Sequence, residues 1–256
     1  MKKKQLTLSL FLLLTALSYV TAQNKLYPNS FSLRDVVLLD GPFKHACDLN
    51  VQTLLKYDTD RLLAPFLKEA GLSPQKESFP NWIGLDGHLG GHYLSALAIH
   101  YATTGNTECK KRMEYMISEL KRCQEANGNG YIGGVPDGKH TWEEIRKGNV
   151  GIVWKSWAPW YNLHKIFAGV RDAWLYGENE EAKQMFLKLC DWGITVISPL
   201  DENQMEEMLN NEFGGMNEIY ADAYQLTQDI KYLDTARKFS HKWLLNSMAN
   251  KKDNLD

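Results

Sequence analysis

Apolar residues recur at helical spacing along most of this chain, and short polar turns divide the helical stretches into pairs. The sequence predicts three such pairs, over residues 88–103 and 108–126, 160–176 and 180–197, and 216–226 and 232–246. In the second pair, Leu163, Phe167 and Val170 line one face of the predicted helix. Each turn carries residues that end one helix or begin the next, so the chain is expected to repeat a helix–turn–helix unit.

Longer segments precede the first helix of every pair. They cover residues 71–87, 127–157 and 197–215. They are expected to be loops at one end of the repeat. A further helix is predicted over 43–67, which Pro65 could stop, and only 36–39 has the pattern of an extended strand. This order predicts an all-α fold, an α/α toroid of helical hairpins whose loops at one end build the functional site.

The number of helical pairs bears on the completeness of this fold. A toroid of six hairpins would need upwards of roughly 350 residues, by extrapolation from the spacing of the pairs. The chain of 256 residues supplies three pairs and a leading helix, so we expect about half a ring and interpret the chain as truncated. An open α-solenoid with a polar cap is the alternative, but the charged residues 251–256 make a poor cap.

The N-terminus has the pattern of a secretory signal peptide. Three lysines precede the mostly apolar residues 6–17, and Val20 and Ala22 are small residues at the usual cleavage positions. We expect residues 1–22 to be removed and 23–256 to form the N-terminal part of a toroid domain. The protein is then exported, periplasmic or extracellular, with no membrane span after cleavage. A retained N-terminal anchor is the alternative.

Charge and cysteine content narrow the class of partner. The formal net charge is −2, and no basic run follows the first lysines, which argues against nucleic acid and anionic membranes. The 8 Trp, 12 Tyr and 9 Phe suit carbohydrate binding but equally suit a large helical core. The cysteines form no CxxC pair, so we expect buried free thiols and not a structural zinc site. They are Cys47, Cys109, Cys123 and Cys190.

Residues 81–98 concentrate the side chains best suited to binding a sugar. Trp82 offers an apolar ring, while Asp86, His88 and His92 offer hydrogen-bonding groups at the mouth of a predicted helix. His88 and His92 are four residues apart, so they share one helical face. A sugar ring combines an apolar face with many hydroxyls, which favours this mixture. Two alternatives stay open: the histidines could bind a metal with Asp86, or could cap and orient the helix. We assign no metal site.

The mouths of the other predicted helices add candidates for the same pocket. They are Tyr131 in the glycine-rich segment 128–134, Trp160 and His164 at the start of the second pair, and Asn217 and Glu218 after two glycines. A structural role is the alternative for His164, and a helix-dipole interaction is the alternative for Glu218. Glycoside hydrolysis needs two carboxyl groups at one bond, but spacing selects no pair. The candidate carboxylates are Asp86, Glu143, Glu144 and Glu218.

Five ordered segments together resemble glycoside hydrolase family 127 and its relative family 146, the β-L-arabinofuranosidase-like enzymes. They are LRDVVLLDGPF at 33–43, GLDGHLGGHYLSALAIHYATTGN at 84–106, NGNGYIGGVPDG at 127–138, WAPWYNLHKIFAGVRDAW at 157–174, and EFGGMNEIYADAYQLTQDIKYLDTARKFSH at 212–241. They span nearly the whole mature chain, and their common order is far more specific than any one short motif.

The resemblance implies a six-hairpin, exo-acting, retaining hydrolase that releases terminal β-L-arabinofuranose from plant glycans or glycoproteins. It also implies a cysteine thiolate nucleophile held near zinc by a Glu and further cysteines, with another Glu as acid/base. A zinc-bound thiol is deprotonated, which would make it nucleophilic. None of the four cysteines here matches those motifs. We therefore expect no catalytic residue and no cofactor in this chain, with the nucleophile, the acid/base and zinc supplied beyond Asp256.

The resemblance carries onto this chain only a substrate pocket. The matching positions are Asp86, His88, His92, Tyr131, His164, Asn217 and Glu218. The expected partner is an arabinofuranoside, and the chain alone is expected to be inactive. Two other functions stay open, a non-catalytic glycan-binding protein and another α/α-toroid sugar enzyme such as an epimerase or uronyl hydrolase.

Overall fold

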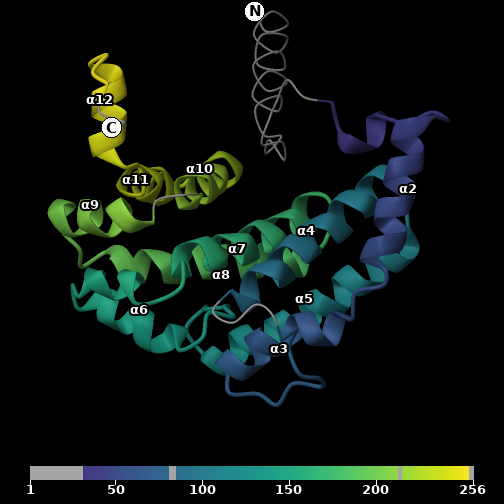
Figure 1. Ribbon diagram of the computed structural model, residues 1–256, viewed down its shortest axis with the longest axis horizontal. Helices are drawn as coiled ribbons and strands as arrows, with labels where there is room; N and C mark the ends of the chain where they lie inside the picture. Colours follow the sequence, from purple (N-terminus) through teal and green to yellow (C-terminus); the bar gives the residue numbers. More distant parts are fainter. Residues whose placement is uncertain (1–30, 81–84, 213–214, 254–256) are drawn as a thin grey trace, which may run out of the picture.

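The computed structural model describes residues 31–80, 85–212 and 215–253, and over these ranges the chain is all-α (Figure 1). The helices are α2 (Pro42–Leu54), α3 (Thr59–Glu69), α4 (Asp86–Thr104), α5 (Thr107–Asn127), α6 (Gly138–Arg146), α7 (Pro159–Leu175), α8 (Glu180–Ile197), α9 (Glu202–Asn211), α10 (Met216–Thr227), α11 (Ile230–Lys238) and α12 (Lys242–Ala249), with short 3-10 helices η1 (Leu33–Asp35) and η2 (Val150–Trp154). The predicted all-α class is confirmed. Residues 36–39 form no strand in the described chain.

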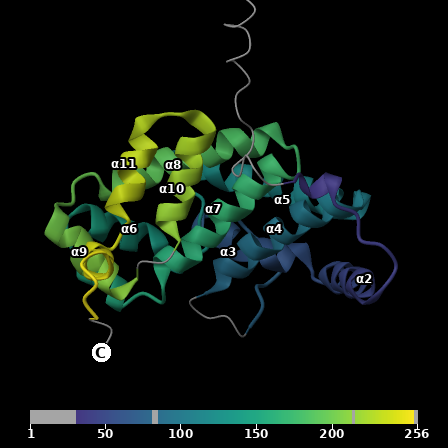
Figure 2. The ribbon, with the colours of Figure 1, turned by 90° about the horizontal axis from the view of Figure 1, so that it is seen from above.

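Three helical hairpins organise the molecule, as the sequence predicts. They are α4–α5, α7–α8 and α10–α11. The first helices of the three hairpins lie side by side, with α7 between α4 and α10, while α5 and α8 pack together behind them (Figures 1 and 2). This alternation of a front and a back helix is the arrangement of an α/α toroid. Several candidate site residues lie near the starts of the front helices α4, α7 and α10. The side-by-side packing of these helices therefore brings those residues to one side of the molecule.

Turn chemistry explains why the hairpins begin and end where they do. Gly105 ends α4 in the left-handed conformation, at φ +70°. The Asn106 side chain then caps α5 by accepting hydrogen bonds from Glu108 N and Cys109 N, both at 3.0 Å. Asn179 caps α8 and Asp229 caps α11 in the same way. These signals are local, so the sequence predicts them well.

Two glycines bring the backbones of α4 and α7 into direct contact. A Cβ atom on Gly91 would overlap the carbonyl group of Lys165, and one on Gly169 would lie 2.7 Å from the carbonyl oxygen of Gly91. No other residue type leaves room for this approach. The close packing fixes the histidine-bearing face of α4 against the first half of α7.

The single helix predicted over 43–67 is wrong, because the chain breaks into α2 and α3. Asp58 starts α3 by accepting hydrogen bonds from Asp60 N at 3.1 Å and Arg61 N at 3.4 Å. An Asp at this position favours a new helix start over continuation. Pro65 lies inside α3 and does not stop it.

Two of the predicted loops contain helices. Segment 127–157 holds α6 and η2, and 197–215 holds α9. Asp201 and Gln204 form a capping box at the start of α9. The buried residues of α9 are Met205, Met208 and Leu209, at helical spacing. The helix predicted over 232–246 also divides, into α11 and α12, and α12 extends away from the body with no buried residue (Figure 1).

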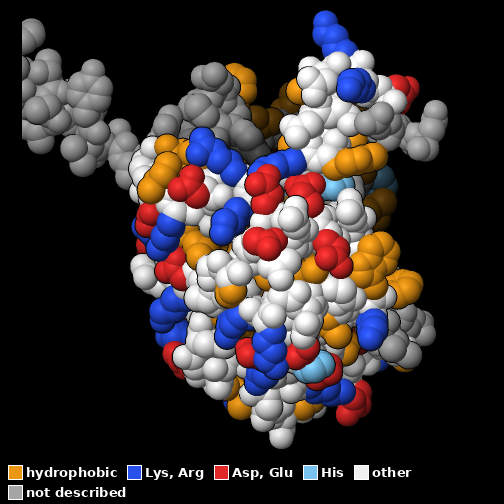
Figure 3. All heavy atoms as spheres, turned by 90° about the vertical axis from the view of Figure 1, so that its left-hand side faces the viewer, with side chains coloured by type: hydrophobic (Ala, Val, Ile, Leu, Met, Phe, Trp, Pro, Cys, Tyr) orange, Lys and Arg blue, Asp and Glu red, His pale blue; other side chains and the backbone are white. Residues whose placement is uncertain are grey.

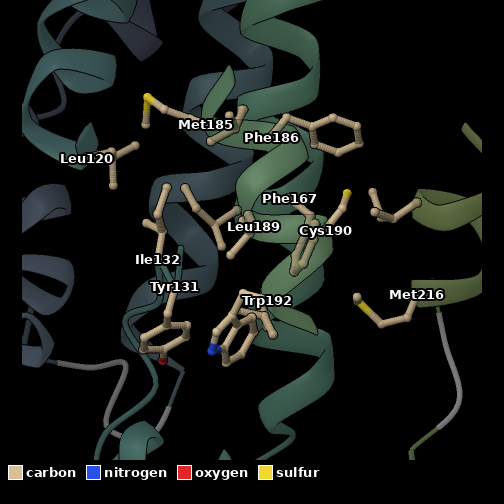
Figure 4. Close-up of a cluster of buried hydrophobic side chains, with 14 of the residues drawn as sticks. Leu120, Tyr131, Ile132, Phe167, Met185, Phe186, Leu189, Cys190, Trp192 and Met216 are labelled. Carbon is tan, nitrogen blue, oxygen red and sulfur yellow. The ribbon is translucent and has the colours of Figure 1, made fainter. Parts of the chain in front are cut away.

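Aromatic and aliphatic side chains fill the space between the two layers. Figure 4 shows part of this core, where Tyr131 and Trp192 lie against each other with ring centroids 4.5 Å apart. The prediction of free cysteines is confirmed, and three are buried as expected, whereas Cys47 is only partly buried. These three are Cys109, Cys123 and Cys190. Burial raises the pKa of the Cys123 thiol to about 12, so this sulfur stays protonated.

The surface carries both signs of charge. On the face in Figure 3, Lys and Arg side chains are interspersed with Asp and Glu. Arg146 and Glu143, for example, pair at 3.4 Å on α6. Among the described helices, none combines the length and the apolar character needed to cross a bilayer.

Candidate functional site

Polar side chains from the three front helices meet along one face, and we call them the histidine cluster. The cluster consists of His88 and His92 on α4, Tyr161, His164 and Lys165 on α7, and Glu218 on α10. His88 and His164 are buried, while the His92, Tyr161 and Glu218 side chains reach solvent. The cluster therefore combines a fixed floor with groups that a ligand can reach.

The α4 part of the cluster is a pair of imidazoles one turn apart. The rings of His88 and His92 have centroids 5.8 Å apart, and His88 lies 5.8 Å from the Tyr161 ring. His88 Nδ1 makes a short hydrogen bond with the Leu85 carbonyl. Since a carbonyl only accepts, the Nδ1 of His88 carries a proton. Partial burial, helped by Lys165, lowers the pKa of His92, so this imidazole is neutral at pH 7.

Leu85 is the residue immediately before α4, so His88 also braces the start of its own helix. This contact agrees with the helix-orienting alternative and is compatible with a ligand role as well. Asp86 begins α4 but borders a different hollow, a cavity of about 320 Å³ on the side of α3 that Glu69 and Asp137 also line.

His164 and Glu218 bring α7 and α10 together. The Nε2 atom of His164 lies 3.5 Å from Oε2 of Glu218, and Nδ1 lies 3.0 Å from the Lys165 ammonium. The neighbouring His164 imidazole, followed by the hydrogen bond from Arg171, lowers the pKa of Glu218 to about 2. Glu218 is therefore a carboxylate at any physiological pH, which makes it an acceptor and a poor proton donor.

Arg171 binds three carboxylates and was not recognised from the sequence. Its guanidinium contacts Asp172 at 3.0 Å, Glu218 at 3.1 Å, and Asp222 by a short ion pair. Burial raises the pKa of Asp222 to about 6, while Arg171 opposes that shift. The spacing of Glu218 and Asp222, four residues apart on one helix, is the signal that could have found this network.

Glu212 is a second residue that sequence reasoning missed. It follows α9 and reaches the first turn of α7, where its carboxylate accepts hydrogen bonds from Trp160 N at 3.0 Å and from Tyr161 N. Ala158, which precedes α7 at φ +43°, has no polar side chain that could cap the helix in this way. Burial raises the pKa of Glu212 to about 7, and the two hydrogen bonds oppose this.

The remaining predicted site residues lie elsewhere. Trp82 lies outside the described residues. Tyr131 and Trp160 are each 1 % exposed and belong to the core, where Trp160 Nε1 donates to the Met208 sulfur at 3.2 Å. Asn217 is exposed, and its side-chain oxygen accepts from Glu218 N at 3.0 Å. Within the cluster the structure thus unites His88, His92, His164 and Glu218.

Metal binding finds no support in the grouping of ligands. Over the described ranges, no three His, Cys, Asp or Glu side chains gather closely enough to hold an ion. Cys47, on α2, has its sulfur 4.0 Å from Nδ1 of His100, outside the cluster. The described residues therefore do not fit a zinc site.

Comparison with known proteins agrees with the resemblance seen in the sequence. A search among curated proteins gives no match. The family model described as beta-L-arabinofuranosidase, GH127 catalytic domain, matches residues 35–256. The matched range includes all three hairpins and the whole histidine cluster. With most of its length matched by that model, and with the all-helical hairpin fold, the chain belongs to the GH127 family of β-L-arabinofuranosidase catalytic domains.

Proposed function

We propose that the histidine cluster binds the terminal β-L-arabinofuranose unit of plant-derived glycans, as part of a glycoside hydrolase site. Membership of the family makes a carbohydrate the expected ligand. The observation that carries the proposal is the convergence of imidazole, phenol and carboxylate groups from three separate hairpins on one face. Hydroxyl groups of a sugar both donate and accept hydrogen bonds, and the cluster offers both kinds of partner.

The four cysteines are poor candidates for the reacting nucleophile. Cys109, Cys123 and Cys190 are at most 1 % exposed, and burial raises the pKa of each thiol. Cys47 is partly exposed but pairs with His100, outside the cluster. We therefore propose that the described residues bind sugar without cleaving it, so that this chain alone is inactive.

The carboxylates, like the cysteines, suit sugar binding and not cleavage. Glu143 and Glu144 lie on α6 and pair with Arg146 at 3.4 Å and Lys147 at 3.0 Å, so neither belongs to the cluster. Glu218 does belong to it, but its pKa of about 2 suits an acceptor and not a general acid. The proposed role of Glu218 is to bind a sugar hydroxyl.

We also propose that residues 1–22 are a signal peptide and that the protein is exported. The support is the sequence pattern alone, because residues 1–30 lie outside the described structure. N-terminal sequencing of protein recovered from outside the cytoplasm should begin near Gln23. Recovery of the chain with residues 1–22 intact in the cytoplasm would contradict the proposal.

Calorimetry with an aryl β-L-arabinofuranoside tests the binding proposal. We expect saturable binding that Glu218→Gln and His164→Gln each weaken by about tenfold, because each removes one hydrogen bond to a charged or buried partner. Glu143→Gln is the matched control, since that carboxylate is solvent-exposed on α6. Equal weakening by the control, or no binding by the parent chain, contradicts the assignment of the site.

The same preparation decides between binding and hydrolysis. Release of the aryl group is expected to stay at the uncatalysed rate while binding is measurable. Binding without release also fits a non-catalytic glycan-binding protein, which the buried cysteines favour as the second candidate for this chain. Release of arabinose at a rate that the parent protein concentration controls would contradict the inactive reading.

A further inference from the structure

Lys165 and His164, neighbours on α7, are in direct contact. The Lys165 ammonium nitrogen lies 3.0 Å from Nδ1 of His164 and 4.6 Å from the centre of the Tyr161 ring. An ammonium group has three donors and no acceptor, so the imidazole Nδ1 must accept. A neutral imidazole has one proton, and with Nδ1 accepting, that proton lies on Nε2. The contact thus selects one tautomer of His164.

The protonated Nε2 of His164 points to Glu218 without being saturated by it. The imidazole is 7 % exposed, and its Nε2 lies 3.5 Å from Oε2 of Glu218, beyond the usual 2.7–3.2 Å of an N–H···O hydrogen bond. Among the described residues, no side chain or backbone group makes a hydrogen bond with this Nε2. A buried donor in this situation favours a further partner such as a ligand hydroxyl.

The other oxygen of Glu218 is held by Arg171. The guanidinium reaches from α7 to α10 and contacts Oε1 of Glu218 at 3.1 Å, while Asp172 and Asp222 hold it from behind. Only 11 % of the Arg171 side chain is exposed, so its donors are directed at protein groups. This anchorage leaves Oε2 of Glu218 facing His164.

We propose that Lys165 and Arg171 are positioning residues that preset a donor and an acceptor for one ligand hydroxyl, the donor being Nε2–H of His164 and the acceptor Oε2 of Glu218. Lys165 sets the tautomer of His164 and Arg171 aims Glu218. A hydroxyl bound between them donates its proton to the carboxylate and accepts from the imidazole. The pair selects a neutral alcohol, because a carboxylate-bearing sugar would face the Glu218 charge.

The binding of a sugar hydroxyl by His164 and Glu218 rests on the proposed function, whereas the tautomer of His164 does not. Long-range proton–nitrogen NMR spectra of the ¹⁵N-labelled full chain, with His164 assigned by His164→Gln, report which nitrogen carries the proton. We expect Nε2–H in the parent protein. Lys165→Met is expected to lose that preference, whereas Lys111→Met, at an exposed lysine on α5, should keep it. An Nδ1–H tautomer in the parent protein overturns the role of Lys165.

A test of the anchoring role of Arg171 needs a variant that keeps a cation beside the three carboxylates, because the charges of these carboxylates would otherwise be unpaired. Arg171→Lys retains the charge but cannot bridge the carboxylates, so the pKa of Glu218, followed by carboxyl carbon shifts, should rise. An unchanged pKa in a folded Arg171→Lys protein overturns the anchoring role. If that variant does not fold, replacing Asp222 by Asn tests the same bridge from its other side.

Calorimetry separates this inference from the proposed function. Lys165→Met and Arg171→Lys are each expected to weaken binding of the aryl arabinofuranoside by about tenfold. If the parent chain binds and both variants bind equally well, the positioning roles are overturned. If the parent chain shows the Nε2–H tautomer but does not bind, the positioning roles stand and the sugar assignment fails.

Discussion

Gly215 packs directly against the imidazole of His164. A Cβ atom at position 215 would lie 2.6 Å from Cδ2 and 2.7 Å from Nε2 of that ring. Gly215 also has φ +93°, which side chains on other residues disfavour. The residue that opens α10 therefore forms one wall of the His164 position and requires glycine for two independent reasons.

Replacing Gly215 with Ala should disturb both the fold and the cluster. The positive φ and the close contact are expected to cost about 1–3 kcal/mol of unfolding free energy, measured in urea, and to shift the His164 resonances. Gly151→Ala is the matched control, because a Cβ there would meet no atom within 4 Å. Equal stability of the two variants contradicts the contact.

The carboxyl of Glu212 predicts a pH-dependent stability. Its pKa is raised from 4.5 to about 7, so the folded chain holds this proton more tightly than the unfolded chain does. The resulting stabilisation is complete below about pH 4.5 and is lost as the pH rises through 7. Its size is on the order of 3 kcal/mol from the difference in pKa. Urea unfolding between pH 4.5 and 8 measures it.

Glu212→Gln isolates this contribution from other titrating groups. Asp222, with a pKa of about 6, acts in the same direction, while the depressed pKa of His92 acts in the opposite one. We therefore expect the difference in unfolding free energy between parent and variant to change with pH in favour of the variant as the pH rises. A difference that is constant over this range contradicts the burial of Glu212.

Thiol labelling should distinguish one cysteine from the other three. In the native protein a disulfide reagent such as dithionitrobenzoate is expected to react quickly with Cys47 only, because the remaining thiols are buried and protonated. Four thiols should react after denaturation. Peptide mapping identifies the labelled site, and fast labelling of Cys123 or Cys190 in the native state would show that the core packing is wrong.

Tyr131 gives a test of core against ligand contact. Its hydroxyl is buried and has no hydrogen-bond partner in the described structure, so removing it should leave stability unchanged or slightly improved. We expect Tyr131→Phe to change the unfolding free energy by less than about 0.5 kcal/mol and to bind the arabinofuranoside as the parent does. If Tyr131→Phe lost affinity for the arabinofuranoside while its stability stayed intact, Tyr131 would have to contact the ligand.

Local signals account for the parts of the fold that the sequence predicts correctly. Gly105 and Asn106 define one hairpin turn by themselves, whatever the rest of the chain does. The start of α9 was missed although Asp201 and Gln204 have the spacing of a capping box, because the polar residues between its buried methionines resemble a loop. The break after α2 depends on Asp58, whose capping role competes with a continuous apolar pattern.

Residues that depend on distant partners could not be predicted in the same way. His164 and Glu218 were expected to share a site because both begin front helices, and they do lie together. Arg171 reaches Glu218 47 residues away, and Glu212 reaches Trp160 52 residues away. The spacing of Glu218 and Asp222 marks two carboxylates on one helical face, but no local pattern identifies the arginine that joins them. Trp160 is buried and its neighbour Tyr161 is exposed, because consecutive residues point about 100° apart around α7, so choosing between them required the phase of the helix.

The contact between Glu212 and the first turn of α7 also constrains how the chain acquires its structure. Hydrogen bonds from Trp160 N and Tyr161 N close a loop of about fifty residues, and such closure is slow compared with the formation of a local turn. During synthesis, the start of α7 therefore leaves the ribosome well before its acceptor exists. The amide of Tyr161 should become protected from hydrogen exchange only after α9 has docked, which makes the completion of this end of α7 a late event.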